Sequence, residues 1–134
     1  MNREIKFRVW DKKKKKFLKP TNRIKITLDG QVTQAGKWAY AVDKKCIIQQ
    51  FTGLEDKDGQ DIYEGDIVSV KLYNDWNDDV AYDVIHLVQW CDVHVGFRGF
   101  TKNMIESKSK MSGAGLPNPI TVLGNYCENP ELLK

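Results

Sequence analysis

The sequence predicts a mainly β protein built as a small antiparallel barrel or sandwich. Three observations lead to this fold class. Hydrophobic residues repeat mostly with a period of two, which is the pattern of strands rather than helices. The apolar segments are short and are separated by glycine and aspartate at intervals of roughly 8 to 12 residues. The chain of 134 residues, 41% of them hydrophobic, has the length and composition of one globular domain, and it has no apolar run long enough to span a membrane.

Alternating residues predict a hairpin near the N-terminus. Apolar Ile5, Phe7 and Val9 alternate with polar residues, and the run ends at Asp11 and five lysines, Lys12–Lys16. Apolar character returns directly after the lysines. We therefore expect two antiparallel strands joined by a highly charged turn.

The next segments predict a second hairpin and a buried strand. Residues 24–28 repeat the alternation, Asp29–Gly30 is a typical two-residue hairpin turn, and Val32 begins the returning strand. Cys46–Phe51 is apolar enough for a short buried strand. A polar, glycine-containing segment, residues 52–65, follows it.

This polar segment resembles a calcium loop only superficially. Aligning Gly59 with the invariant loop glycine puts Leu54 at the first ligand position and Gly65 at the twelfth, where a bidentate glutamate is required. We interpret Asp58–Gly59 as a turn instead, in which the aspartate accepts local hydrogen bonds and the glycine takes a positive φ.

Strands are predicted again in the second half of the chain. Residues 67–70 form one strand, and residues 80–90 form a long one whose middle is apolar on both faces, so we expect it to be central in its sheet. Residues 93–100 follow, with glycines that favour a bulge or bend. Ile120–Leu123 is the last strand. Asn129 is expected to cap a single helical turn that begins at the proline after it.

Charge is segregated along the chain, although the net charge is only +3. Residues 1–25 hold eleven Lys and Arg against two acidic residues, a local balance of +9, and residues 55–83 hold ten acidic residues against two lysines, a balance of −8. The basic segment is either a solvated turn whose lysines block unwanted strand pairing or a contact surface. The opposite charges would also permit a head-to-tail contact between copies. The candidate contacts for nucleic acid or an acidic partner are Arg8, Lys12, Lys13, Lys14, Lys15, Lys16, Arg23 and Lys25.

The sequence offers no catalytic residue, metal site or cofactor site. Cys46, Cys91 and Cys127 form an odd set without a close pair, which favours free thiols in a reducing cytoplasm. His86 and His94 flank Cys91, but no orienting or oxyanion group accompanies them, and three ligands at irregular spacing are a weak metal signal. No known catalytic or nucleotide-binding motif occurs, and the N-terminus lacks the apolar stretch of a secretory signal.

Three blocks occur in order along the chain. They are IKFRVWD at residues 5–11, QFTGL at 50–54 leading through Asp58–Gly59 into IYEGDIV at 62–68, and VLGNYCENPELL at 122–133. In combination they resemble the YopX family, small proteins of phages and integrated prophages. The resemblance implies a mostly β fold with an SH3-like barrel and no established catalytic residue or cofactor.

We therefore expect one YopX-like domain over residues 1–134, with an N-terminal β-hairpin extension over about 1–50, an SH3-like barrel (β-roll) over about 51–134 and a short C-terminal helical turn. The expected function is that of a phage or prophage accessory protein in the host cytoplasm. It would be a non-enzymatic protein-interaction or assembly module that binds a protein partner or itself. The alternative is a nucleic-acid-binding protein that uses the basic hairpin.

Overall fold

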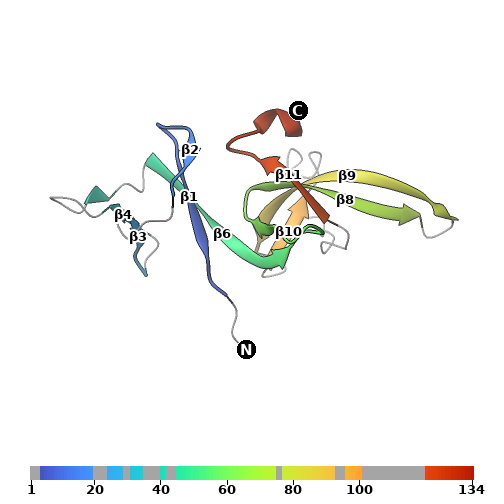
Figure 1. Cartoon of the computed structure of the whole chain (residues 1–134), viewed down its shortest axis with the longest axis horizontal. Helices are drawn as coiled ribbons and strands as arrows, with labels where there is room; N and C mark the ends of the chain where they lie inside the picture. Colours follow the sequence, from blue (N-terminus) through green and yellow to red (C-terminus); the bar gives the residue numbers. More distant parts are fainter. Residues whose placement is uncertain are drawn as a thin grey trace. The chain divides into compact units, whose positions relative to one another are not determined.

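The computed structural model describes residues 4–19, 24–28, 31–34, 40–41, 45–74, 77–92, 96–100 and 120–134. The chain is mainly β and its sheets are antiparallel, as predicted (Figure 1). It divides into two compact units, Ile5–Gln50 and a second unit that contains Phe51–Lys134 with Met1–Glu4. Within the described residues, no helix has the length and apolar character needed to cross a membrane.

The unit Ile5–Gln50 contains the predicted N-terminal hairpin. Strand β1 (Phe7–Asp11) pairs with β2 (Lys16–Phe17) on one side and with the first half of β6 (Cys46–Glu55) on the other. A second small sheet has the order β3 (Ile24–Ile26), β4 (Val32–Gln34), β5 (Tyr40–Ala41). The predicted pairing of residues 24–26 with the segment from Val32 is confirmed, whereas the Asp29–Gly30 turn lies outside the described residues.

The core of this unit follows from the alternation along its strands. Buried Val9, Val32 and Cys46 come from β1, β4 and β6. Partly buried aliphatic residues surround them: Leu18, Ile24, Ile26 and Ile48. Trp10 points to the other face of β1 because successive side chains alternate, and there it packs edge-on against Phe17 at a centroid distance of 5.0 Å.

Strand β6 is longer than the sequence predicts. It continues past Phe51 to Glu55, and its second half pairs with β7 (Asp61–Tyr63). The register shifts between Phe51 and Glu55, where Gly53 has a φ of 87°. The alternation expected of a strand is therefore interrupted at this irregularity.

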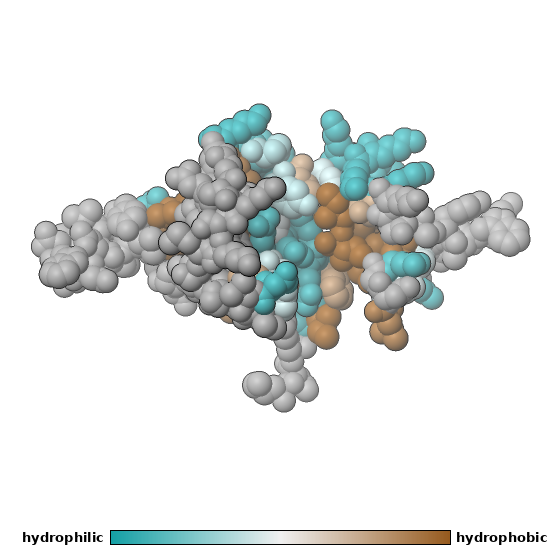
Figure 2. Space-filling view, turned by 180° about the vertical axis from the view of Figure 1, so that it is seen from behind, coloured by the Kyte–Doolittle hydropathy of each residue, from teal (hydrophilic) through white to brown (hydrophobic). Residues whose placement is uncertain are grey.

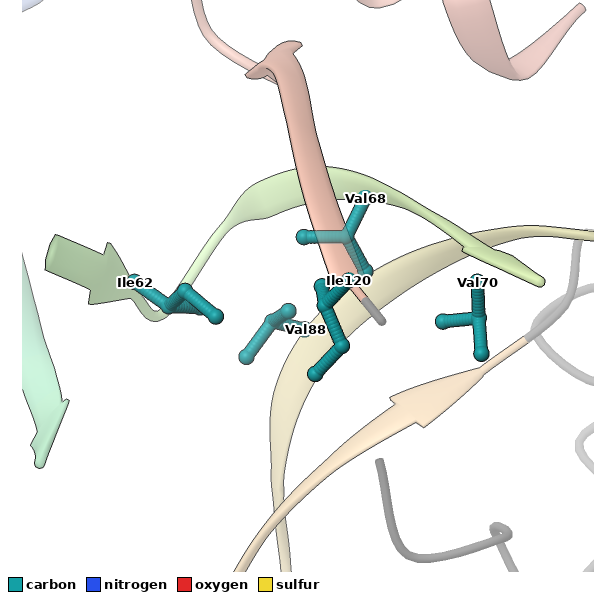
Figure 3. Packing of buried hydrophobic residues seen from close by; sticks show 5 residues of the cluster. All are labelled: Ile62, Val68, Val70, Val88 and Ile120. Carbon is teal, nitrogen blue, oxygen red and sulfur yellow. The ribbon is translucent and has the colours of Figure 1, made fainter. Parts of the chain in front are cut away.

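The main sheet of the second unit has the order β10 (Gly96–Phe100), β9 (Asn77–Cys91), β8 (Asp66–Asn74), β11 (Ile120–Asn125). Its strands curl as in half of a barrel (Figure 1). Strand β9 lies between two neighbours, which confirms its predicted central position. One face of the sheet supplies the core, in which residues of β8, β9 and β11 meet Ile62 of β7 (Figure 3). The buried members are Ile62, Val68, Val70, Val88 and Ile120.

Asp56, rather than the predicted Asp58, organises the turn between β6 and β7. The carboxylate of Asp56 is buried, and its Oδ1 accepts hydrogen bonds from the N–H groups of Asp58 (2.8 Å) and Gln60 (2.9 Å). Its Oδ2 accepts from the N–H of Val122 in β11 at 3.2 Å. Gly59 has the predicted positive φ, 79°. One carboxylate thus closes the turn and ties it to a strand 66 residues away.

A buried carboxylate–amide pair joins the start of β8 to the end of β11. Asp66 accepts from the N–H of Tyr63 (2.8 Å) and from Nδ2 of Asn125 (3.1 Å), and Oδ1 of Asn125 accepts from the N–H of Cys127 (2.9 Å). Gly65, at a φ of 81°, donates its N–H to Val88 and accepts from the N–H of Tyr126. The sequence blocks 62–68 and 122–133 therefore contact each other in the fold.

The chain ends in a 3-10 helix, η2 (Pro130–Leu133). Asn129 occupies the predicted N-cap position and a proline begins the helix, but the Asn129 side chain makes no cap hydrogen bond. Instead, Oδ1 of Asn129 accepts from the N–H of Asn125 at 3.4 Å. A Cβ on Gly124 would lie 2.5 Å from this oxygen and 3.1 Å from Cδ1 of Leu132, so glycine permits the close approach of the C-terminal segment.

The Asp56 carboxylate should contribute stability that depends on pH. Its burial raises its pKa, but the hydrogen bonds from Gln60, Val122 and Asp58 outweigh this, so the pKa is below its usual value. The stability that it contributes is present above the unfolded-state pKa of about 3.9 and is lost as the pH falls through the lower folded-state pKa. Asp56→Asn is expected to lower the free energy of unfolding at pH 7 by about 2 kcal/mol and to weaken its dependence on pH between about 5 and 3. Urea unfolding of parent and variant at pH 7, 5 and 3 measures both effects. If the free energy of unfolding falls equally between pH 5 and 3 in the two proteins, the prediction is contradicted.

Gly124→Ala tests the close approach of the C-terminal segment. The added methyl group displaces the Asn129 side chain, and its hydrogen bond to Asn125 is lost. We expect a destabilisation of about 1–3 kcal/mol, which is typical of overpacking, measured by urea unfolding at pH 7. Parent-like stability of the variant would show that η2 moves away at little cost.

Candidate functional site

The candidate site is the end of the β1–β2 hairpin, here called the lysine tip and defined as Lys12–Lys16. All five lysines are exposed. Seen from behind, hydrophilic side chains project from this end of the hairpin (Figure 2). The turn residues are Lys12–Lys15, and Lys16 begins β2. The structure thus gathers five cations at one end of a two-stranded hairpin.

Asp11 holds the backbone of the turn. Its Oδ1 accepts from the N–H groups of Lys13 and Lys14, both at 2.9 Å. The hydrogen bond from Lys14 is the largest influence on the Asp11 carboxyl and, with that from Lys13, lowers its pKa against the opposing effect of burial. The carboxylate is therefore ionised at neutral pH. Nζ of Lys14 lies 3.9 Å from Oδ2 of Asp11, and an exposed pair of this kind leaves the ammonium group free to exchange partners.

The residues below the tip form a packed base. Nε of Arg8 donates to Oε1 of Gln49 at 2.8 Å, and its guanidinium lies 4.6 Å from the centroid of the Phe17 ring. The Phe17 ring also contacts Trp10, which is only 6% exposed. Arg8 therefore contributes to the stability of the hairpin and lies at its base rather than at its tip.

The remaining predicted contact residues are not part of the tip. Lys25 is exposed on β3, in the other small sheet of this unit. It lies between Ile24 and Ile26, whose side chains pack into the core, so its own side chain points away from that core. Arg23 lies outside the described residues.

The structure adds one residue that the sequence reasoning missed. The N–H of Lys12 donates to the carbonyl of Lys45 at 2.9 Å, which places exposed Lys45 beside the tip. The sequence feature that could have indicated this is the position of Lys45, immediately before the strand that begins at Cys46. It becomes informative only when Asp11 is known to pair with Cys46.

Some acidic side chains of residues 55–83 are buried, so the surface of this segment carries less negative charge than its sequence suggests. Asp56 and Asp66 are buried and accept hydrogen bonds, so their charges are used within the fold. Glu55 and Asp58 are exposed, and Glu55 lies directly opposite Asp61 in the β6–β7 pair. The acidic side chains of this turn that reach solvent are therefore fewer than the balance of −8 implies.

The structure separates the two described members of the candidate thiol site, His86 and Cys91. His86 is buried and Cys91 is half-buried, and five positions along β9 place their side chains on opposite faces of the strand. His94 lies outside the described residues. Among the residues that the structure describes, no group of three His, Cys, Asp or Glu is arranged to hold a metal ion.

Comparison with known proteins matches almost the whole chain. The family model described as YopX protein matches residues 6–134. The crystal structure of protein EF1440 from Enterococcus faecalis is similar in fold, with a TM-score of 0.59 and 24% sequence identity over 99% of this chain and 100% of that chain. No curated protein matches the sequence.

The backbone of the lysine tip is strained at Lys15, and this strain can be tested by substitution. Lys15 has a φ of 50°, which costs a non-glycine residue about 1 kcal/mol or more. Lys15→Gly is therefore expected to leave the free energy of unfolding unchanged or to raise it by up to about 1 kcal/mol. Lys14→Gly removes the same charge without relieving strain and is expected to lower it by about 0.5–1 kcal/mol. Thermal and urea unfolding measure the stability of the two variants. A Lys15→Gly variant less stable than Lys14→Gly would contradict the positive φ at Lys15.

Proposed function

This chain belongs to the YopX family, and we propose that it is a phage- or prophage-encoded accessory protein that acts by binding and not by catalysis. Its place of action in this proposal is the cytoplasm of the host cell. We also propose that the unit containing Phe51–Lys134 is an SH3-like barrel with the C-terminal helical turn at one end. The curl of the four-stranded antiparallel sheet supports this.

The leading form of the proposal is a protein-interaction or assembly module. The observation that carries it is the lysine tip, five exposed cations on a turn fixed by Asp11. A turn that is already ordered loses little conformational freedom when it binds. The partner in this proposal is an acidic protein surface, including that of a second copy of this chain, because opposite charges steer association.

The second candidate function is nucleic-acid binding through the same tip. It is favoured by the composition of the tip, which holds lysines and no apolar residue between Asp11 and Phe17. Lysine is depleted in the cores of protein–protein interfaces, whereas it is a common contact of phosphate groups.

Capture from induced host cells separates the two candidates. The parent protein is compared with the double variant Lys13→Ser/Lys14→Ser and with the control Lys57→Ser/Lys134→Ser, which removes the same charge from exposed lysines elsewhere. An interaction module predicts a specific protein that is retained by parent and control after nuclease treatment and at least tenfold reduced with the tip variant. Retention that nuclease abolishes supports the nucleic-acid candidate. Equal retention by tip variant and control would contradict any role of the tip.

A further inference from the structure

The lysine tip and Lys45 together carry about as many positive charges as duplex DNA carries phosphates over the same width. Hydrogen bonding places Lys45 beside Lys12, so six lysines lie at the ends of the neighbouring strands β2, β1 and β6. Adjacent strands are about 4.8 Å apart, which makes this group about 10 Å wide. Duplex DNA carries one negative charge per about 1.7 Å of its axis, or about six over that width, and a single strand carries about half as many.

The aromatic residues next to the tip are not arranged to bind single strands. Proteins that bind single strands stack bases on exposed aromatic rings. Here Trp10 is buried, and Phe17 is half-buried between the Trp10 ring and the Arg8 guanidinium. Phe7 is 43% exposed, but it is at the opposite end of β1 from the tip. Stacking at the tip would therefore require the packed base of the hairpin to open.

The shape and composition of the tip favour the backbone of B-form DNA. The major groove of B-DNA admits a two-stranded ribbon, whereas the major groove of an A-form RNA helix is deep and narrow. The tip holds no Arg, Asn or Gln, the side chains that read base edges with paired hydrogen bonds. Its ammonium groups are point charges suited to phosphate oxygens.

We infer that the lysine tip binds the phosphate backbone of double-stranded DNA without reading its sequence, with Lys12–Lys16 and Lys45 flanking the groove. This inference rests on the second candidate function above and specifies its ligand. The Asp11 carboxylate does not oppose it strongly, because two backbone N–H groups donate to that charge.

Fluorescence anisotropy with three probes tests the inference. The probes are a 20-base-pair DNA duplex, one of its single strands and an RNA duplex of the same sequence, each titrated with full-length protein between 50 and 200 mM salt. We expect the DNA duplex to bind at least about tenfold more tightly than the single strand, with equal affinity for a second duplex of unrelated sequence. Log K should fall linearly with log salt, by about 0.9 for each phosphate contact.

Matched variants show whether the tip is responsible. Lys13→Ser/Lys14→Ser should reduce the salt slope by about 2, since two contacts are lost, whereas Lys57→Ser/Lys134→Ser should leave the slope near that of the parent. Circular dichroism and thermal unfolding of each variant check that the hairpin is folded.

The outcomes separate this inference from the function on which it rests. Tip-dependent binding that is equal or tighter for the single strand or the RNA duplex overturns the DNA assignment and leaves nucleic-acid binding standing. A sequence preference among duplexes overturns the backbone mode. The absence of binding to all probes at 50 mM salt overturns both this inference and the nucleic-acid candidate.

Discussion

The buried hydrogen bond between the Asp66 carboxylate and the Asn125 amide is the constraint on which the second unit depends. A carboxylate removed from water is costly unless it is hydrogen-bonded, and Asp66 is 1% exposed. Its two oxygens accept from the N–H of Tyr63 and from Nδ2 of Asn125, and Asn125 is the residue paired with Asp66 at one end of the β8–β11 ladder. Two distant segments must therefore meet before either polar group is satisfied, and this favours one register over its neighbours.

Two of the sequence blocks that suggested the YopX resemblance meet in this network. The blocks 62–68 and 122–133 supply both sides of the Asp66–Asn125 pair and of the backbone hydrogen bonds around Gly65. Gly124 allows the C-terminal segment to approach closely. These residues determine the fold, and the binding surface that we propose lies on a different unit.

Local patterns were sufficient to predict much of the fold. The alternation at residues 5–9 and 80–90 predicted strands, and the lysines after Asp11 predicted a charged turn. What the sequence did not show depends on contacts between distant residues. Asp56 rather than Asp58 accepts the hydrogen bonds of the turn, and its second oxygen also accepts from the distant Val122, a contact that no local pattern indicates. Lys45 joins the tip through the pairing of β1 with β6, and Asn129 is drawn to Asn125 and away from capping η2.

The turn at Asp56 also covers part of an exposed sheet edge. Strand β11 is at the edge of its sheet, and edge strands offer unpaired backbone groups to other chains. The Asp56 carboxylate accepts a hydrogen bond from the N–H of Val122, and the N–H of Lys57 donates one to the carbonyl of Ile120. Two backbone groups that a foreign strand would need are therefore already occupied. The side chain of Asp56 and the backbone of Lys57 thus protect this part of the edge from pairing with another chain, without a further strand in the sheet.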